Sequence, residues 1–362
     1  MLTKLPHIEP DSLPPLWNSE EDDRLICRSI VDETNDVKTF TFSAPAPRLF
    51  HFAPGQFLTF TFPIGGEPVN RCYTISSSPA RPHMVSITVK RTVGGPVSNW
   101  LHDHLRVGDI IRAIGPMGEF STAFHPCEKR LFLSGGSGVT PLMSMVRHES
   151  DMAEDYDTIF VHCARTPKDI VFRQELDVIA QRRSRLQVAH VVESVTGEYG
   201  WSGYRGRVSR ALFDLIVPDL HEREIFCCGP APFMAAVRKI LEASGFNMAR
   251  YHEESFLFED LAPAAEEPQP VESASRTHNI TFGKTGRSIP CDENTTILAA
   301  ARAAGLRLPS SCTKGLCGTC KTRKFSGEVE MAHNGGIRQR EIDQGFILLC
   351  CSKPRGDIVV DR

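Results

Sequence analysis

Three closely spaced cysteines near the C-terminus constrain this chain most strongly. Cys312, Cys317 and Cys320 follow the pattern Cys-x4-Cys-x2-Cys, and Cys350 comes after 29 intervening residues. Two irons bridged by sulfide need two thiolate ligands each, and this spacing is typical of a four-thiolate [2Fe–2S] site. Two glycines inside the loop would let the backbone wrap around such a cluster. The pattern therefore predicts that Cys312, Cys317, Cys320 and Cys350 are the metal ligands.

Two other uses of these cysteines are a structural zinc site and a disulfide cluster. Zinc loops usually come as paired Cys-x2-Cys knuckles with histidine alternatives, and no second knuckle follows here. Four segments resemble the plant-type ferredoxin family, whose domain is a β-grasp α+β fold: Ser310-Ser-Cys312, Cys317-Gly-Thr-Cys320, Gly327-Glu-Val and Leu349-Cys350-Cys351-Ser-Lys-Pro354. In that resemblance Cys350 keeps the family's spacing to the following proline, and Cys351 is the alternative fourth ligand.

Length and composition set the remaining limits. A chain of 362 residues is too long for one ferredoxin and predicts two or three domains. The net charge of −3 argues against a nucleic-acid-binding protein, and no apolar run is long enough for a transmembrane helix. The start lacks the apolar core of a signal peptide, and the other eight cysteines follow no framework spacing. We therefore expect a cytoplasmic protein without a membrane or nucleic-acid partner.

The first third of the chain alternates between apolar and polar residues. Six short strands are predicted, at 25–30, 37–42, 56–62, 73–75, 85–90 and 110–114, with one helix at 97–105. Short strands at turn-punctuated intervals favour a small antiparallel β-barrel. Within it, Arg71 offers a fork to a phosphate, Tyr73 a ring that can stack on a flavin, and Thr74 a hydroxyl for the flavin N5. Alone, this motif is more typical of an ordinary strand with an exposed arginine and a buried tyrosine.

The middle of the chain alternates strands with helices. A strand at 131–134 runs into the Gly-rich turn 135–141 and a helix at 142–147, which Thr140 could cap. Further strands are predicted at 158–163, 186–192 and 224–228, with helices at 171–182 and 209–216. This order predicts a parallel sheet with helices on both faces. The Gly-rich turn could present N–H groups to a pyrophosphate, or be a tight turn without a ligand.

Together with Pro54-Gly-Gln-Phe57, Gly94-Gly-Pro-Val-Ser98, Gly115-Pro-Met-Gly-Glu-Phe120 and Cys227-Cys228-Gly-Pro, these motifs resemble the ferredoxin–NADP reductase superfamily. The resemblance implies a bound FAD, with FMN as the alternative, held by Arg71, Cys72, Tyr73, Thr74, Gly95, Val97, Ser98 and Phe256. It implies a nicotinamide nucleotide held by Gly136, Gly138, Val139, Thr140, Pro141, Cys228, Gly229 and Pro230. The residues implied at the reacting rings are Tyr73, Thr74, Cys228 and Phe256, where Phe256 covers the flavin face.

The nucleotide is predicted to be NADH. Sites for NADPH usually place arginine or lysine around the 2′-phosphate, and Arg165 and Lys168 lie in the corresponding loop. The Ser-Arg and Lys-x-x-Tyr pattern of plant-type NADPH enzymes is nevertheless missing from this sequence.

The predicted domain order is an N-terminal arm at 1–22, the FAD-binding barrel at 23–126, the NAD-binding domain at 127–258, a Pro-, Ala- and acid-rich linker at 259–276 and the ferredoxin domain at 277–362. The last segment holds 13 Lys and Arg against 8 Asp and Glu. Lys314, Lys321, Arg323 and Lys324 lie near the ligand loop, which is compatible with an ordinary solvated surface or with docking to an acidic patch on the electron acceptor.

These cofactors predict an NADH-dependent oxidoreductase that accepts a hydride on flavin and passes single electrons through the [2Fe–2S] cluster. The sequence resembles reductase components of Rieske oxygenases, especially those that demethylate glycine betaine or carnitine-like quaternary amines. A terminal Rieske-type oxygenase is therefore the predicted partner. The segments Arg71-Cys-Tyr-Thr-Ile-Ser-Ser-Ser-Pro79 and Met117-Gly-Glu-Phe120 also resemble the NADH reductase of the hybrid-cluster protein. A redox sensor without a dedicated acceptor is a third hypothesis.

Overall fold

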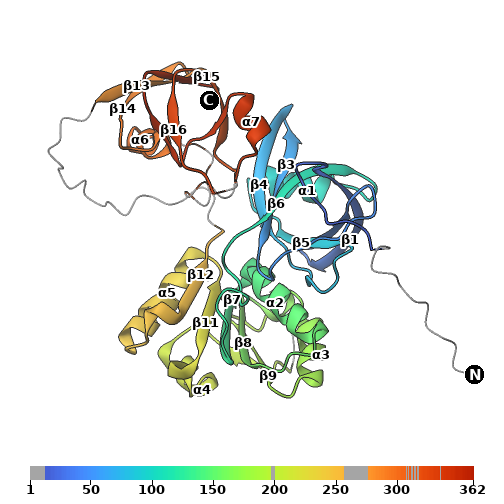
Figure 1. The fold of residues 1–362 in the computed structure, drawn as a ribbon. Helices are drawn as coiled ribbons and strands as arrows, with labels where there is room; N and C mark the ends of the chain where they lie inside the picture. The colour runs from blue at the N-terminus through green and yellow to red at the C-terminus, as the bar shows by residue number, and fades with distance from the viewer. Residues whose placement is uncertain are drawn as a thin grey trace, which may run out of the picture.

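The structure is a computed structural model that describes residues 13–196, 200–256 and 276–362, except 307, 309, 311, 312, 314, 316, 317 and 335. Three lobes are visible in Figure 1, a blue N-terminal lobe, a green and yellow central lobe and an orange to red C-terminal lobe. Each lobe is built around its own β-sheet. The predicted linker at 259–276 lies, except for Arg276, outside the described residues.

The N-terminal lobe is an antiparallel barrel, as predicted. Its strands follow the order β4-β3-β6-β1-β2-β5, and a bridge between Ile75 and Ile87 joins the two outer strands. Alternation along the strands buries one face, with Phe40 and Phe42 of β2 and Phe60 and Phe62 of β3 completely inside. The elements are β1 (Arg24–Thr34), β2 (Val37–Ser43), β3 (Phe57–Ile64), β4 (Glu67–Thr74), β5 (Val85–Lys90), α1 (Pro96–Asp103) and β6 (Ile110–Met117).

Strand β4 is longer than the sequence predicted. The expected strand began at Tyr73, whereas β4 begins at Glu67 and pairs along its whole length with β3. Pro68 argues against a central strand because it cannot donate to a ladder, but β4 lies at the end of the strand order, where proline is tolerated. The consequence is that Arg71 belongs to a regular strand and its position is set by the pairing.

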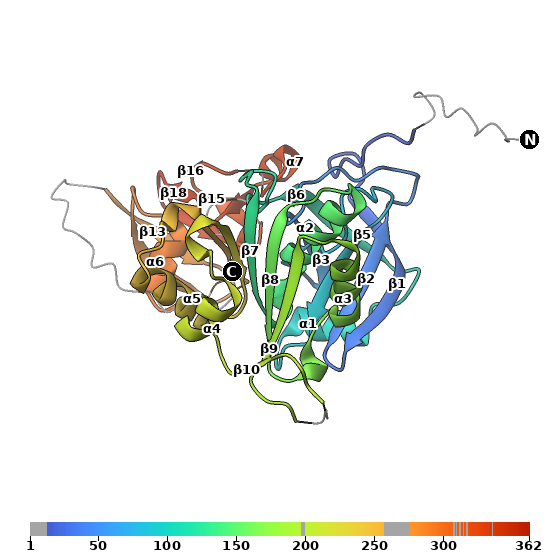
Figure 2. The ribbon, with the colours of Figure 1, turned by 90° about the horizontal axis from the view of Figure 1, so that it is seen from below.

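The central lobe is a six-stranded parallel sheet with the order β10-β9-β8-β7-β11-β12. The helices α2 and α3 pack on one face, against a core that contains Phe132 and Phe160, and α4 and α5 pack on the other, against Leu131 and Leu133. Figure 2 shows these helices on the two sides of the sheet. The prediction of helices on both faces is confirmed. The elements are β7 (Lys129–Gly135), α2 (Val139–Asp151), β8 (Asp157–Ala164), α3 (Arg173–Arg182), β9 (Leu186–Val192), β10 (Tyr204–Arg205), α4 (Arg210–Ile216), β11 (Glu224–Cys228), α5 (Ala231–Ala243) and β12 (Tyr251–Glu254), with short 3₁₀ turns at Gly136–Gly138, Pro167–Asp169, Leu220–Glu222 and Met248–Arg250.

The C-terminal lobe combines a mixed sheet of order β14-β13-β19-β15-β17 with a two-stranded sheet of β16 and β18. Helix α6 packs on a core that includes Ile280, Phe282 and Leu348. A mixed sheet with one covering helix agrees with the expected α+β ferredoxin fold. The elements are β13 (Thr277–Phe282), β14 (Arg287–Asp292), α6 (Ile297–Ala303), β15 (Lys321–Ser326), β16 (Val329–Met331), α7 (Gln339–Asp343), β17 (Phe346–Leu348), β18 (Ser352–Pro354) and β19 (Ile358–Val360).

The described part of the N-terminal arm lies on the barrel. Leu16 bridges to Leu49, and the Trp17 ring packs on Phe50 with ring centroids 5.2 Å apart. In the described residues of all three lobes, no helix is both long enough and apolar enough to cross a bilayer.

Candidate functional site

The predicted flavin motif lies on β4. Alternation places Arg71 and Tyr73 on one face of the strand and Cys72 and Thr74 on the other. Arg71 and Thr74 are 8% and 6% exposed, and the Tyr73 ring meets the Phe62 ring edge-on at 6.2 Å. Burial raises the pKa of Tyr73, so its phenol stays neutral. A buried arginine, a fixed aromatic ring and a hydroxyl on one strand fit the predicted flavin.

The second flavin segment opens helix α1. Gly95 is the N-cap, and the Ser98 hydroxyl accepts from the Thr92 amide at 3.1 Å and donates to the Gly95 carbonyl at 3.3 Å. Val97 is a core residue. The hydroxyl therefore holds the turn in shape, and the helix N-terminus, where backbone N–H groups gather, is the part suited to a phosphate. The implied contacts of Gly95, Val97 and Ser98 remain predictions.

The Gly-rich turn between β7 and α2 lies directly against the end of β11. A Cβ atom added to Gly138 would stand 2.2 Å from the Cys228 carbonyl oxygen and 2.6 Å from the Gly229 nitrogen. A Cβ added to Gly135 would stand 3.0 Å from a side-chain carbon of Pro230. The structure thus brings the two predicted nicotinamide segments, 136–141 and 228–230, into backbone contact, and this cradle fits a dinucleotide.

Thr140 does not cap helix α2, so that prediction is wrong. Gly138 is the N-cap, and the Thr140 hydroxyl donates back to the Ser137 carbonyl at 3.2 Å. The helix starts two residues earlier than a threonine cap requires, because the preceding 3₁₀ turn leads directly into it. Val139, Thr140 and Pro141 are all buried in the first turn, which leaves the backbone as the surface for a ligand.

Cys228 closes the floor of this cradle. Its side chain is fully buried, and burial raises the pKa of the Cys228 thiol well above the ordinary value. A neutral thiol is a poor nucleophile. Position 228 therefore suits a small side chain that a nicotinamide ring can approach. It does not suit a nucleophile that forms a covalent intermediate.

Glu254 joins the flavin and nicotinamide segments, and the sequence analysis did not assign it a role. Thr74 donates to its Oε2 at 3.4 Å, and the Cα of Glu254 lies opposite that of Cys228 in the pairing of β11 with β12. Burial raises the pKa of Glu254 to about 8, only partly offset by the Thr74 hydrogen bond. One feature of the sequence could have pointed to Glu254. It is an acid at the carboxyl end of a parallel strand, where ligands of α/β sheets bind. Phe256, two residues on, is half-buried against the core under the sheet.

We expect Glu254→Gln to flatten the pH dependence of flavin reduction by NADH. Below pH 8 the carboxyl is protonated and neutral; above it, a partly buried negative charge stands beside Thr74 and opposes the arrival of a hydride. The wild-type rate should therefore fall severalfold between pH 7 and 9 as about 1 kcal/mol of repulsion appears. Glutamine mimics the neutral form at every pH. Anaerobic stopped-flow absorbance measures this step, and parallel profiles for the two proteins would contradict the assignment.

The cluster site is only partly described, since Cys312 and Cys317 lie outside the described residues. Cys320 and Cys350 are buried, and the Cys350 amide donates to the Cys320 sulfur at 3.5 Å. An N–H group aimed at a ligand sulfur is typical of iron–sulfur sites. Within the described ranges, no group of three or more His, Cys, Asp or Glu could hold a metal. The two described thiols fit the cluster, and the four-ligand set stays a prediction.

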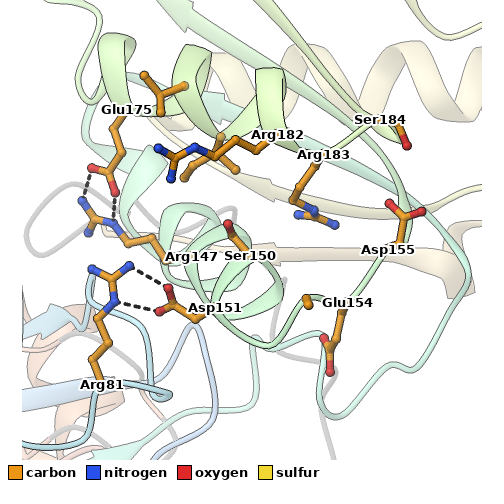
Figure 3. A pocket seen from close by; sticks show the side chains of 13 residues that line it. Arg81, Arg147, Ser150, Asp151, Glu154, Asp155, Glu175, Arg182, Arg183 and Ser184 are labelled. Carbon is orange, nitrogen blue, oxygen red and sulfur yellow. Dashed lines mark hydrogen bonds and ion pairs between the residues drawn. The ribbon is translucent and has the colours of Figure 1, made fainter. Parts of the chain in front are cut away.

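A cavity of about 720 Å³ lies at the other end of helix α2 (Figure 3). Arg81 of the barrel pairs with Asp151 at 2.6 Å, and Arg147 pairs with Glu175 at 2.6 Å. Because α2 is 13 residues long, Asp151 at the edge of this cavity is about 20 Å from Gly138. Its charged groups hold the barrel against the central lobe and take no part in the site at Thr74 and Cys228.

Comparison with known proteins agrees with this geometry. Models of the oxidoreductase FAD-binding domain, the oxidoreductase NAD-binding domain and the 2Fe-2S iron-sulfur cluster binding domain match residues 25–122, 132–239 and 280–355. The predicted FAD, NAD and [2Fe–2S] domain types and their order are thereby confirmed. A solved phthalate dioxygenase reductase is 26% identical with a TM-score of 0.56, and the match covers 96% of this chain and 100% of that chain.

Two curated relatives match over nearly their full length. The glycine betaine monooxygenase reductase subunit of Pseudomonas aeruginosa is 47% identical, covering 92% of this chain and 94% of that protein. The stachydrine N-demethylase reductase subunit of Rhizobium meliloti is 44% identical, covering 95% and 97%. The chain therefore belongs to the family of three-domain flavin and iron–sulfur reductase subunits that includes the glycine betaine monooxygenase reductases.

Proposed function

We propose that this protein is the NADH-dependent reductase component of a Rieske-type oxygenase that demethylates a quaternary amine such as glycine betaine. The observation that carries the proposal is the position of β4, which touches both other lobes. Thr74 meets Glu254 beside Cys228. Asn70 and Cys72 meet Gly318 and Thr319 in the loop that carries the predicted cluster ligands, called here the cluster loop. The relatives named above, reductase subunits of a glycine betaine monooxygenase and of a stachydrine N-demethylase, support this class of substrate.

On the nicotinamide side, the protein contributes position and electrostatics. A bound flavin accepts two electrons as a hydride and can release them singly, so the chemistry belongs to the cofactor. The Gly138 turn and the backbone of Cys228 and Gly229 would hold the nucleotide, and the small buried thiol lets its ring approach β4. Thr74 would orient the flavin, and Glu254, whose pKa is raised to about 8, keeps a proton next to the Thr74 hydroxyl at neutral pH.

On the cluster side, β4 offers a short path. Asn70 donates to the Gly318 carbonyl at 3.3 Å, and the Cys72 sulfur lies 3.6 Å from the Thr319 hydroxyl. Thr319 and Cys320 are each 2% exposed, so water is excluded from this contact. One strand thus carries the flavin motif and touches the residues next to a predicted cluster ligand, as sequential electron transfer requires.

Arg165 supports NADH as the electron donor. Its guanidinium pairs with Asp169 at 2.8 Å and with Asp36 at 3.3 Å. An arginine already engaged by two carboxylates is poorly placed to bind a 2′-phosphate, and the carboxylates themselves would repel it. We also propose a cytoplasmic location and retain the predicted domain boundaries and site residues.

The proposed docking cations need one revision. Lys321 donates to Glu341 at 2.6 Å and its side chain is 13% exposed, so it is an internal ion pair of the ferredoxin lobe. Arg323 is exposed and remains a candidate for contact with an acidic acceptor, whereas Lys314 lies outside the described residues.

Reconstitution with an oxygenase tests this function. The purified protein, a glycine betaine-type Rieske oxygenase and NADH should consume oxygen and release formaldehyde in amounts equal to the NADH oxidised. Omitting the oxygenase should leave ferricyanide reduction intact but stop formaldehyde release, and NADPH should support a rate at least about tenfold lower. Rapid ferricyanide reduction without electron delivery to any such oxygenase would contradict the proposed partner.

A further inference from the structure

The ferredoxin lobe contacts the barrel through a group of ion pairs as well as at β4. Asp23, immediately before β1, accepts from Arg112 at 2.8 Å and from Arg338 at 3.1 Å, and Arg340 approaches at 3.4 Å. Arg112 belongs to the barrel, whereas Arg338 and Arg340 flank the start of α7. Figure 1 shows α7 lying beside the barrel strands β3 and β4. We call Asp23, Arg112, Arg338 and Arg340 the Asp23 cluster.

The centre of the Asp23 cluster is shielded from water, whereas Arg112 and Arg340 at its edge are 63% and 44% exposed. The Asp23 side chain is 7% exposed and that of Arg338 is 11% exposed. Both arginines of the ferredoxin lobe also donate to the turn before Asp23. Arg338 donates to the Ser19 carbonyl at 3.1 Å, and Arg340 donates to the Glu20 carbonyl at 3.3 Å. A buried carboxylate is costly unless it is paired in the right geometry, so this contact strongly favours one placement of the ferredoxin lobe.

Backbone contacts connect the Asp23 cluster to the loop that carries the predicted iron–sulfur ligands. Gly336, two residues before Arg338, donates to the Gly315 carbonyl at 2.9 Å. A Cβ added to Gly318 would stand 2.6 Å from the Gly336 carbonyl oxygen, so the two backbones are packed without room for a side chain. Fixing Arg338 on Asp23 therefore also fixes Gly318 and Thr319 where they touch Asn70 and Cys72 of β4.

We infer that Asp23 is a positioning residue for electron transfer, holding the ferredoxin lobe in the orientation that brings its cluster loop against β4. The inference rests on the proposed function. Asp23 itself need not touch a cofactor, because it acts through Arg338 and the segment that follows Gly336. Weakening the Asp23 cluster lowers the fraction of molecules in which the iron–sulfur ligand loop meets β4. The rate of electron transfer from flavin to the iron–sulfur centre falls with that fraction.

The test compares Asp23→Asn with Asp22→Asn by anaerobic stopped-flow with NADH. Asp22 is the neighbouring acid, and it pairs only with Arg24 of the same lobe among the described ion pairs. In Asp23→Asn, bleaching of the iron–sulfur absorbance should slow about tenfold while flavin reduction keeps its rate. Asp22→Asn should match the wild type in both phases. Arg340→Gln, whose side chain is 44% exposed, should slow the same phase about threefold without endangering the fold.

Small-angle X-ray scattering gives a readout that does not depend on turnover. Asp23→Asn should have a larger radius of gyration than the wild type at low salt, and the wild type should approach it as salt screens the ion pairs. The double variant Asp23→Asn with Arg338→Gln should slow cluster reduction by less than the product of the two single effects, because both substitutions weaken the shared Asp23–Arg338 contact. The inference would be overturned if Asp23→Asn and Arg340→Gln left both the scattering and the reduction of the iron–sulfur cluster unchanged. It would also be overturned if flavin reduction slowed as much as iron–sulfur reduction. A wild-type cluster that NADH cannot reduce would overturn the proposed function and this inference together.

Discussion

Replacing Cys350 by serine should abolish the iron–sulfur absorbance and slow NADH-driven cytochrome c reduction at least about 100-fold. Cys350 is 7% exposed and its amide donates to the Cys320 sulfur, so the two residues share one interior site. A serine hydroxyl cannot replace a thiolate ligand at neutral pH. Ferricyanide reduction should continue, because that acceptor can take electrons directly from the flavin. Iron content, visible absorbance and the two acceptor assays check this result.

Cys351→Ser is the matched control. The Cys351 thiol is half-buried and lies 3.7 Å from the Leu348 carbonyl oxygen, to which it donates. We expect this variant to keep its cluster and its cytochrome c activity. Cys317→Ser should behave like Cys350→Ser, although Cys317 lies outside the described residues. A cluster lost in Cys351→Ser and kept in Cys350→Ser would reassign the fourth ligand.

Gly138→Ala should reduce NADH oxidation at least about 100-fold with every acceptor. The added methyl would stand 2.2 Å from a backbone oxygen and 2.6 Å from a backbone nitrogen. Neither atom can yield by a side-chain rotation, so the Gly-rich turn must separate from the segment after β11. That separation removes the cradle for the nucleotide. Stopped-flow flavin reduction by NADH measures the loss, and NADH titration of the oxidised protein measures binding.

The barrel and the ferredoxin lobe provide the internal control for Gly138→Ala. Flavin content and iron content should stay normal, and dithionite should still reduce both cofactors, because neither site includes this turn. Gly356→Ala is the matched substitution, since a Cβ there meets no atom within 4 Å. Wild-type NADH kinetics in Gly138→Ala would show that the nucleotide does not use this turn.

Several elements followed directly from local sequence patterns. The strands predicted at 186–192 and 224–228 have those bounds in the structure, as β9 and β11. Both are short apolar runs bounded by polar or turn residues, and strands of a parallel sheet covered on both faces keep such runs. The predicted barrel strands also appear, because one buried face imposes strict alternation.

Other elements could not be predicted because their signals depend on their neighbours. Strand β4 contains Pro68, and only its place at the end of the strand order makes that proline acceptable. Helix α5 begins at Ala231 beside two prolines, where the sequence indicates a turn. The short strands β15 to β19 have three to six residues each, too few for a period to be recognised.

The sequence by itself determined the cofactor domains and their order, because cysteine spacing, Gly-rich turns and strand alternation are patterns within short segments. Only the tertiary structure identified Glu254 and Asp23. Glu254 meets Thr74 across 180 positions of the chain, and Asp23 meets Arg338 across 315. The sequence contains many acids, and which of them is withdrawn from water and paired depends on how the lobes pack. That packing is a sum of contacts between distant segments, which no local pattern contains.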